Sequence, residues 1–170
     1  TRLQMEKERL RSDPTATPEQ RLKAATDTLA ASAEVAKLEQ QAEDLRESFE
    51  AKFWDEALQT YVIALDGEKR PCRVRSSNAG HLLWCGIVST ERAQATGRTL
   101  LAPDSFSGWG IRTIAREEAR YNPMSYHNGS VWPHDNALIA AGLARYGHKG
   151  AVGRVFGALF DAASYMELRR

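Results

Sequence analysis

The sequence predicts an all-α fold of antiparallel helical hairpins, stacked as a solenoid or closed into a ring. Residues that favour helices dominate the first third of the chain, where no glycine occurs before Gly67. Further on, stretches with helical apolar spacing alternate with Gly-, Pro- and Asn-rich breaks, which gives helix pairs of roughly 30 to 45 residues. One extended segment interrupts this pattern, so we also expect a small β-hairpin.

Two helices are predicted near the N-terminus. The first covers residues 1–12, carries few apolar side chains and is broken by an Asp-Pro pair. The second begins after Thr17, which can serve as N-cap, with a proline at the first helical position and Gln20 completing a capping box. We therefore expect residues 1–25 to form a poorly anchored helical arm and residues 26–170 to form a partial helical domain.

The second helix carries an apolar face along its C-terminal half. The members of this face recur every three or four residues, and glutamates occupy the opposite face. A helix of this kind buries its apolar face, so we expect the face to pack against another part of the protein. The face consists of Leu38, Ala42, Leu45, Phe49 and Phe53.

The extended segment follows this helix. Residues 61–65 read as a strand, Asp66 and Gly67 form a hairpin turn signal, and residues 73–75 supply a returning strand. Helical spacing then resumes, and the helix pairs on either side of a long loop cover residues 79–88, 89–101, 133–146 and 149–166. Trp54 and Trp84 fall on apolar faces and are expected in the core.

The long loop covers residues 103–131. It holds breakers such as Gly108, Gly110, Asn122, Pro123 and Gly129 among several aromatic residues, with a short helical turn expected near residues 113–118. Ordered loops of this length commonly carry function. The functional site is therefore expected in this segment.

Composition excludes several classes of protein. Residues 1–60 carry 9 basic and 13 acidic side chains, and residues 61–170 carry 14 and 9, so no basic stripe favours nucleic acid. No apolar run is long enough to cross a membrane. Cys72 and Cys85 lack the spacing of a zinc site, and we expect reduced thiols, a cytoplasmic location, no metal and no cofactor.

The loop and the helix start that follows it contain the residue types that a sugar site needs. Aromatic rings can stack on the apolar faces of a pyranose, while guanidinium, imidazole, amide and carboxylate groups can bind its hydroxyls. A well-packed polar loop would have the same composition, and both interpretations remain open. The predicted substrate-binding residues are Trp109, Arg112, Tyr126, His127, Asn128, Trp132, His134 and Asp135.

The same segment resembles a known family. Trp-Gly-Ile-Arg at residues 109–112 and Tyr-Asn-Pro-Met-Ser-Tyr-His-Asn-Gly-Ser-Val-Trp-Pro-His-Asp-Asn at residues 121–136 are similar to bacterial amylo-alpha-1,6-glucosidase (glycogen-debranching-type) domains. The Tyr-His-Asn-Gly core also recurs in neutral invertases. Blocks at residues 73–81 and 53–54 resemble the same debranching-type group, and the resemblance covers about residues 38–160.

This resemblance implies a six-hairpin (α/α)6 toroid, of which the chain would be a C-terminal-side fragment. It implies a glycoside hydrolase that acts on alpha-glucosidic bonds, the alpha-1,6 branches of glycogen-like oligosaccharides. Inverting glycosidases use two carboxyl groups, an acid and a base. The resemblance places both of them outside these 170 residues. We therefore expect the fragment to be inactive alone and to supply the sugar-binding wall.

Two alternatives remain open from the sequence. Asp135 is the one candidate catalytic carboxylate inside the chain, but its place after Pro133 also suits an acid that stabilises a helix start. The chain as a whole could instead be a non-catalytic helical module that binds a partner protein or a glycan. Self-association is expected in either case, because an open helical ring exposes apolar side chains such as Val155, Phe156, Leu159 and Phe160.

Overall fold

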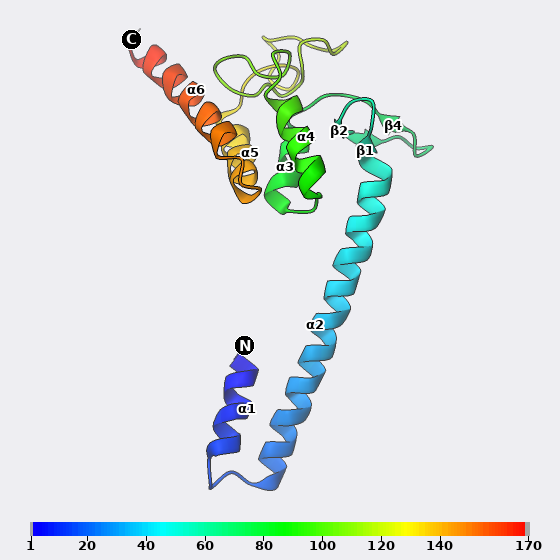
Figure 1. The fold of residues 1–170 in the computed structure, drawn as a ribbon, viewed down its shortest axis with the longest axis vertical. Coiled ribbons are helices and arrows are strands. Elements are labelled where there is room, and N and C mark those ends of the chain that lie inside the picture. Colours follow the sequence, from blue (N-terminus) through cyan, green and yellow to red (C-terminus); the bar gives the residue numbers. More distant parts are fainter. Residues whose placement is uncertain (1, 169–170) are drawn as a thin grey trace. The chain divides into compact units, whose positions relative to one another are not determined.

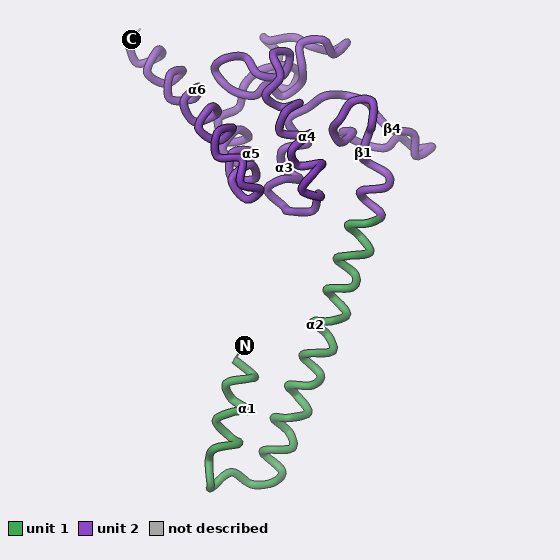
Figure 2. Tube along the Cα trace, in the orientation of Figure 1, with its two compact units in different colours: residues 1–47 green, residues 48–170 purple. Residues whose placement is uncertain are grey.

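The computed structural model describes residues 2–168 and confirms the helical fold class (Figure 1). Contacts divide the chain into two compact units, Thr1–Glu47 and Ser48–Arg170 (Figure 2). A separation of arm from domain at residue 25 stays a prediction. In chain order the helices and strands are α1 (Arg2–Ser12), α2 (Pro18–Phe53), β1 (Trp54–Asp55), β2 (Thr60–Tyr61), β3 (Ala64–Leu65), β4 (Pro71–Cys72), α3 (Asn78–Cys85), α4 (Thr90–Leu100), α5 (Pro133–Arg145) and α6 (Lys149–Glu167).

The first unit is a helical hairpin of α1 and most of α2. The predicted capping box is present, because the Thr17 N–H donates to Gln20 Oε1 at 2.9 Å and the Gln20 N–H donates to Thr17 Oγ1 at 3.2 Å. Thr28 is the only buried residue between residues 2 and 47. The hairpin is therefore held mainly by local helical interactions.

The predicted apolar face of α2 is packed only at its C-terminal end. Phe49 and Phe53 lie in the second unit and pack against its core, with their rings stacked at 4.6 Å between centroids. Leu38 and Leu45 are 54% and 63% exposed. The expectation that the whole face is buried was wrong for these two leucines.

Two small antiparallel sheets follow α2. Trp54 pairs with Tyr61 in the β1–β2 sheet, and Ala64 pairs with Cys72 in the β3–β4 sheet. A β-hairpin is therefore present, but its strands differ from those expected. Residues 61–65 are divided between β2 and β3, and the returning strand is Pro71–Cys72 instead of residues 73–75. Extended structure also begins earlier, at Trp54. Trp54 is only half-buried, with its ring at 5.1 Å from that of Tyr61.

A partly buried carboxylate, that of Glu50, ties the end of α2 to the start of α4. Glu50 Oε1 accepts hydrogen bonds from the Tyr61 hydroxyl at 2.8 Å and from the Ser89 N–H at 2.9 Å, and Arg92 pairs with Glu50 Oε2. Burial acts to raise the pKa of Glu50, but the bonds from Arg92, Tyr61 and Ser89 outweigh it and lower that pKa. Burial, together with Glu50, raises the pKa of Tyr61.

The core of the second unit lies between α3, α4, α5 and α6. Helix α5 packs against both α3 and α6, and α3 also contacts α4. Glycines allow α3 and α5 to approach closely. A Cβ added to Gly80 would lie 2.5 Å from Ile139 Cγ1, and one added to Gly142 would lie 2.5 Å from the backbone nitrogen of Trp84. Trp84 is 50% exposed, so its predicted place in the core was wrong.

The two faces of α6 differ in burial. Val155 and Ala158 are buried in the core, whereas Phe156 and Phe160 are 70% and 62% exposed. From the sequence, Val155 is expected to be exposed, and this expectation was wrong because Val155 is buried. No helix within residues 2–168 combines the length and apolar character that crossing a membrane requires.

Candidate functional site

The long loop joins the C-terminus of α4 to the N-terminus of α5 and lies at one end of these helices (Figure 1). The helical turn expected at residues 113–118 does not form, and a bridge followed by a turn takes its place. Isolated antiparallel bridges order the loop: Ser76 pairs with Ile114, Phe106 with Ile111, and Arg112 with Val131.

The side chain of Asn136 holds the middle of this loop to α5. Its Nδ2 donates to the carbonyl oxygens of Ile111 and Trp132 at 2.9 and 3.0 Å, and its Oδ1 accepts from the Ile111 N–H at 2.7 Å. Asn136 is fully buried. The Asn136 amide therefore pairs with both backbone hydrogen-bonding groups of Ile111, as a neighbouring strand would do in a sheet.

Sequence reasoning quoted Asn136 within the motif but assigned it no role. The available signal was its position, because asparagine is a poor helix former that bonds readily to nearby backbone. Here it follows directly after the first turn of a helix.

A groove of about 800 Å³ lies between the loop and the C-terminal half of α6. Trp109 lines it, with its ring 5.4 Å from that of Tyr165, so the indole and the phenol meet at one wall. Arg112 is the one charged side chain among the described residues that line the groove. The remaining lining residues are Ser107, Pro123, Gly129, Ser130, Val131, Pro133, Leu159, Ala162, Ala163 and Met166.

The guanidinium of Arg112 has few partners. It lies over the ring of Tyr121 at 5.6 Å from the centroid, and its Nη1 donates to the Gly129 carbonyl at 3.4 Å. Its Nε is buried, and within residues 2–168 that atom has no hydrogen-bond partner and the side chain has no ion pair. The groove therefore presents a guanidinium group that can bind an oxygen-rich ligand.

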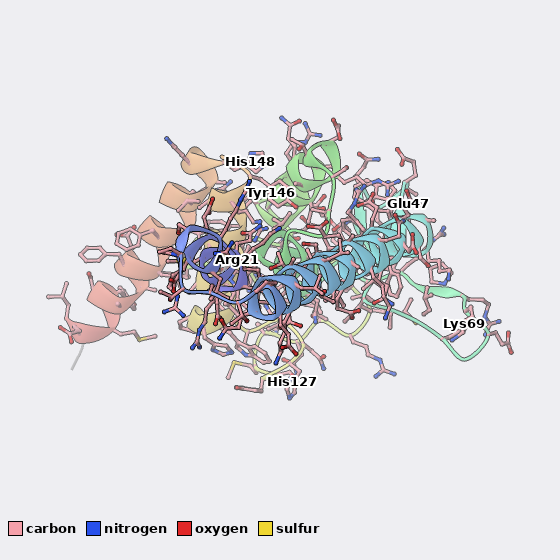
Figure 3. The ribbon with its side chains drawn as sticks, turned by 90° about the horizontal axis from the view of Figure 1, so that it is seen from below. Arg21, Glu47, Lys69, His127, Tyr146 and His148 are labelled. Atoms are coloured by element: carbon pink, nitrogen blue, oxygen red, sulfur yellow. The ribbon has the colours of Figure 1, made fainter. Side chains whose placement is uncertain are left out.

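Four of the predicted binding residues form a separate ring cluster outside the groove. The Trp132 ring lies 4.7 Å from that of Tyr126, 5.4 Å from that of His127 and 5.3 Å from that of His134. The Trp132 Nε1–H donates to the Tyr126 carbonyl at 2.9 Å. Tyr126 is 65% exposed, and His127, labelled in Figure 3, is also exposed.

Asn128 and Asp135 lie apart from the groove lining. The Asn128 carbonyl accepts from the Asn122 N–H at 2.7 Å, and this bond closes the loop of residues 122–128. Asp135 lies in the first turn of α5, as expected for an acid at a helix start. Its side chain is only 5% exposed and pairs with His81 Nε2.

His81, which is not among the binding residues predicted from the sequence, is the partner of Asp135 in the structure. Its role was hidden because 54 residues separate the two in sequence. The substrate-binding assignments made from sequence stay predictions. The structure brings Trp109 and Arg112 to the groove and gathers Tyr126, His127, Trp132 and His134 beside one another. No cluster of three or more potential metal ligands occurs within residues 2–168.

Helical hairpins that carry a long loop and an aromatic groove at one end define the fold class. Two solved structures share this fold. Neutral trehalase Nth1 from Saccharomyces cerevisiae matches 73% of this chain and 23% of its own with a TM-score of 0.62 and 21% identity. A sialidase matches 82% of this chain and 14% of its own, with a TM-score of 0.64 and 15% identity.

The sequence narrows this class to one family. Residues 16–169 match the Mannosylglycerate hydrolase MGH1-like glycoside hydrolase domain, and the chain belongs to that family. Mannosylglycerate hydrolases MGH1 and MGH2 of Selaginella moellendorffii are each 32% identical to it over 81 residues, which is 47% of this chain. The matched segment spans 17% of the length of those relatives. Membership of a six-hairpin glycosidase family is thus confirmed, whereas the narrower amylo-alpha-1,6-glucosidase resemblance is not.

Proposed function

We propose that the protein hydrolyses glycosidic bonds and that this chain supplies one wall of its sugar-binding site. The observation that carries the proposal is the groove, in which the Trp109 indole and the Arg112 guanidinium face the same space. An indole covers the apolar face of a sugar ring, and a guanidinium donates to its oxygens. Family membership supports the same reaction class.

For the substrate, we propose alpha-glucosidic bonds, with the alpha-1,6 branches of glycogen-like oligosaccharides first. The motif at residues 109–112 and 121–136 supports this choice through its likeness to debranching-type domains. Mannosylglycerate is the second candidate, because two relatives are mannosylglycerate hydrolases. The unpaired Arg112 favours this candidate specifically, since a glycerate carboxylate would neutralise it.

The catalytic acid and base are proposed to lie outside this chain. Asp135 is an unsuitable candidate for either role, because its buried carboxylate already pairs with His81. The isolated chain is therefore expected to show no turnover. A groove with one wall also encloses less of a ligand, so its sugar affinity is expected to be low.

The test compares the two substrate classes in the full-length protein. Branched alpha-1,6 glucosides and mannosylglycerate are assayed with the wild type, Arg112→Gln and the control Arg116→Gln, which changes an exposed arginine of the same loop. For mannosylglycerate, we expect Arg112→Gln to lower kcat/KM about 100-fold, or about 2.7 kcal/mol, and Arg116→Gln to leave it unchanged. For a neutral glucoside, we expect Arg112→Gln to lower kcat/KM about tenfold. Absence of hydrolysis with every glycoside would contradict the proposal.

Self-association and a cytoplasmic location belong to the same proposal. The exposed Phe156 and Phe160 rings on α6 lie 6.4 Å apart and form an apolar patch that another protein surface can cover. Both cysteines are free, with Cys85 exposed, which suits a reducing compartment. Light scattering of the isolated chain over a range of concentrations tests the association.

A further inference from the structure

Three separate segments meet at the first turn of α5. Trp132, the N-cap residue, holds the 126–132 loop through its bond to the Tyr126 carbonyl. Asn136, one turn later, holds the backbone of Ile111 in the loop that carries Trp109 and Arg112. Between these two residues, Asp135 pairs with α3. The orientation of this single turn therefore sets the geometry of both loops around the groove.

His81 on α3 is the residue that fixes Asp135. It follows Gly80, which contacts Ile139 on α5. Asp135 precedes Ile139 by one helical turn and so lies on the same face of α5. The histidine Nε2 therefore reaches Asp135 Oδ1 beside a close contact of the α3–α5 interface.

The pair is a poor way to gain stability alone. Asp135 is buried, yet within residues 2–168 its Oδ2 has no hydrogen-bond partner, so burial of this carboxylate is only partly compensated. Buried ion pairs can often be replaced by apolar residues without loss of stability. The helix interface already packs Gly80 of α3 against Ile139 of α5, and Leu83 of α3 against Gly142 of α5. The hydrogen bond between His81 and Asp135 instead adds a directional contact, which fixes how the first turn of α5 is rotated about the helix axis.

We propose that His81 is a positioning residue: through Asp135 it orients the first turn of α5 and thereby holds both loops of the groove. The effect on catalysis rests on the proposed function, whereas the effect on loop order does not. Displacing a substrate contact by about 1 Å can reduce turnover about 100-fold. His81 therefore acts on the reaction without touching the groove lining.

The first test measures loop order by hydrogen exchange in the full-length protein. His81→Leu removes the donor but keeps the volume of a mid-sized side chain, and His81→Gln keeps an N–H donor. We expect His81→Leu to speed exchange at residues 105–113 and 121–132 at least tenfold. Exchange within α3 and α5 should change less than twofold, and His81→Gln should restore most of the loop protection.

Arg73→Leu is the matched control. Arg73 pairs with Asp55, whose side chain is also 5% exposed, and both basic partners are partly exposed. This variant therefore breaks an equivalent pair at the small sheets instead of at α5. Exchange in the two loops should match that of the wild type. Equal loosening of the loops by Arg73→Leu, or equal loosening of α3 and α5 by His81→Leu, would overturn the proposal.

The second test is kinetic. We expect His81→Leu to lower kcat 10- to 100-fold with less than a threefold change in KM, and His81→Gln to recover at least half of the lost kcat. If the wild type hydrolyses no glycoside, the proposed function fails and the exchange result still decides the role of His81. If His81→Leu does not fold, Asp135→Asn, which keeps the side-chain shape, is measured instead. Unchanged loop exchange in that variant would overturn the proposal.

Discussion

The first compact unit, described over residues 2–47 and from here on called the arm, differs from the loop at residues 103–132 in how it is ordered. The arm consists of regular helix, and Thr28 is its one buried residue within the described part of the chain. The loop contains no helix, yet Phe106, Ile111, Thr113 and Ile114 are all buried in it. In these two segments, regular secondary structure and burial therefore do not coincide, unlike in helices α3 to α6, which surround the core.

The difference lies in where the backbone hydrogen bonds come from. In the arm, helix propensity and a capping box satisfy the backbone within a few residues. In the loop, distant groups do so: Asn136 bonds to Ile111 across 25 residues, and the Thr113 hydroxyl accepts from the Gly129 N–H across 16. Local patterns predict the first kind of order, and only tertiary contacts produce the second.

The largest expected effect comes from removing the amide that orders the loop. Asn136→Ala leaves the buried N–H and carbonyl of Ile111 without partners and opens a small cavity, which should cost about 3 kcal/mol. Urea unfolding followed by tryptophan fluorescence measures the loss. Asn122→Ala is the control, because Asn122 is exposed and accepts one local bond from the Met124 N–H. A loss equal to that of the control would show that the loop holds itself together.

The helices could be predicted to within a few residues from spacing and caps alone. The helix expected at residues 89–101 is present as α4, and α5 begins at Pro133, as the sequence indicates. The division of the site could not be predicted, because residues 109 to 135 are close in sequence but face different ways in the fold. Trp109 lines the groove, Trp132 joins the ring cluster and Asp135 is buried. Their chemistry can be read from residue type, whereas their directions depend on distant contacts.

A second, smaller effect should come from a glycine in the loop. Gly110 has φ +146°, and an added Cβ would lie 2.7 Å from Val131 Cγ1 and 3.0 Å from Asn136 Oδ1. Gly110→Ala combines backbone strain with a clash, so we expect a loss of about 2 kcal/mol in unfolding free energy. Gly108→Ala, with φ +94° and no atom within 4 Å of the added Cβ, isolates the strain. If the two variants lose equal stability, the close contact with Val131 has no energetic role.

In the arm, the capping box should have a smaller and strictly local effect. Thr17→Ala removes the oxygen that accepts from the Gln20 N–H, which should cost about 1 kcal/mol of local helix stability. Hydrogen exchange should quicken about fivefold in the first turns of α2 and remain unchanged in the loop at residues 103–132. Thr26→Ala, an exposed threonine within α2, controls for the loss of the side chain itself.

The smallest effect is expected on the exposed apolar face of α2. Leu45 is 63% exposed, so Leu45→Gln removes little apolar contact and should change the unfolding free energy by less than about 0.5 kcal/mol. Leu143→Ala, at a fully buried leucine of α5, should cost about 2 to 5 kcal/mol. Both are measured by urea unfolding at two protein concentrations tenfold apart. A loss above 1 kcal/mol for Leu45→Gln that grows with concentration would show that a second copy of the chain covers this face. The arm would then be ordered by burial after all, and its contrast with the loop would apply only to the isolated chain.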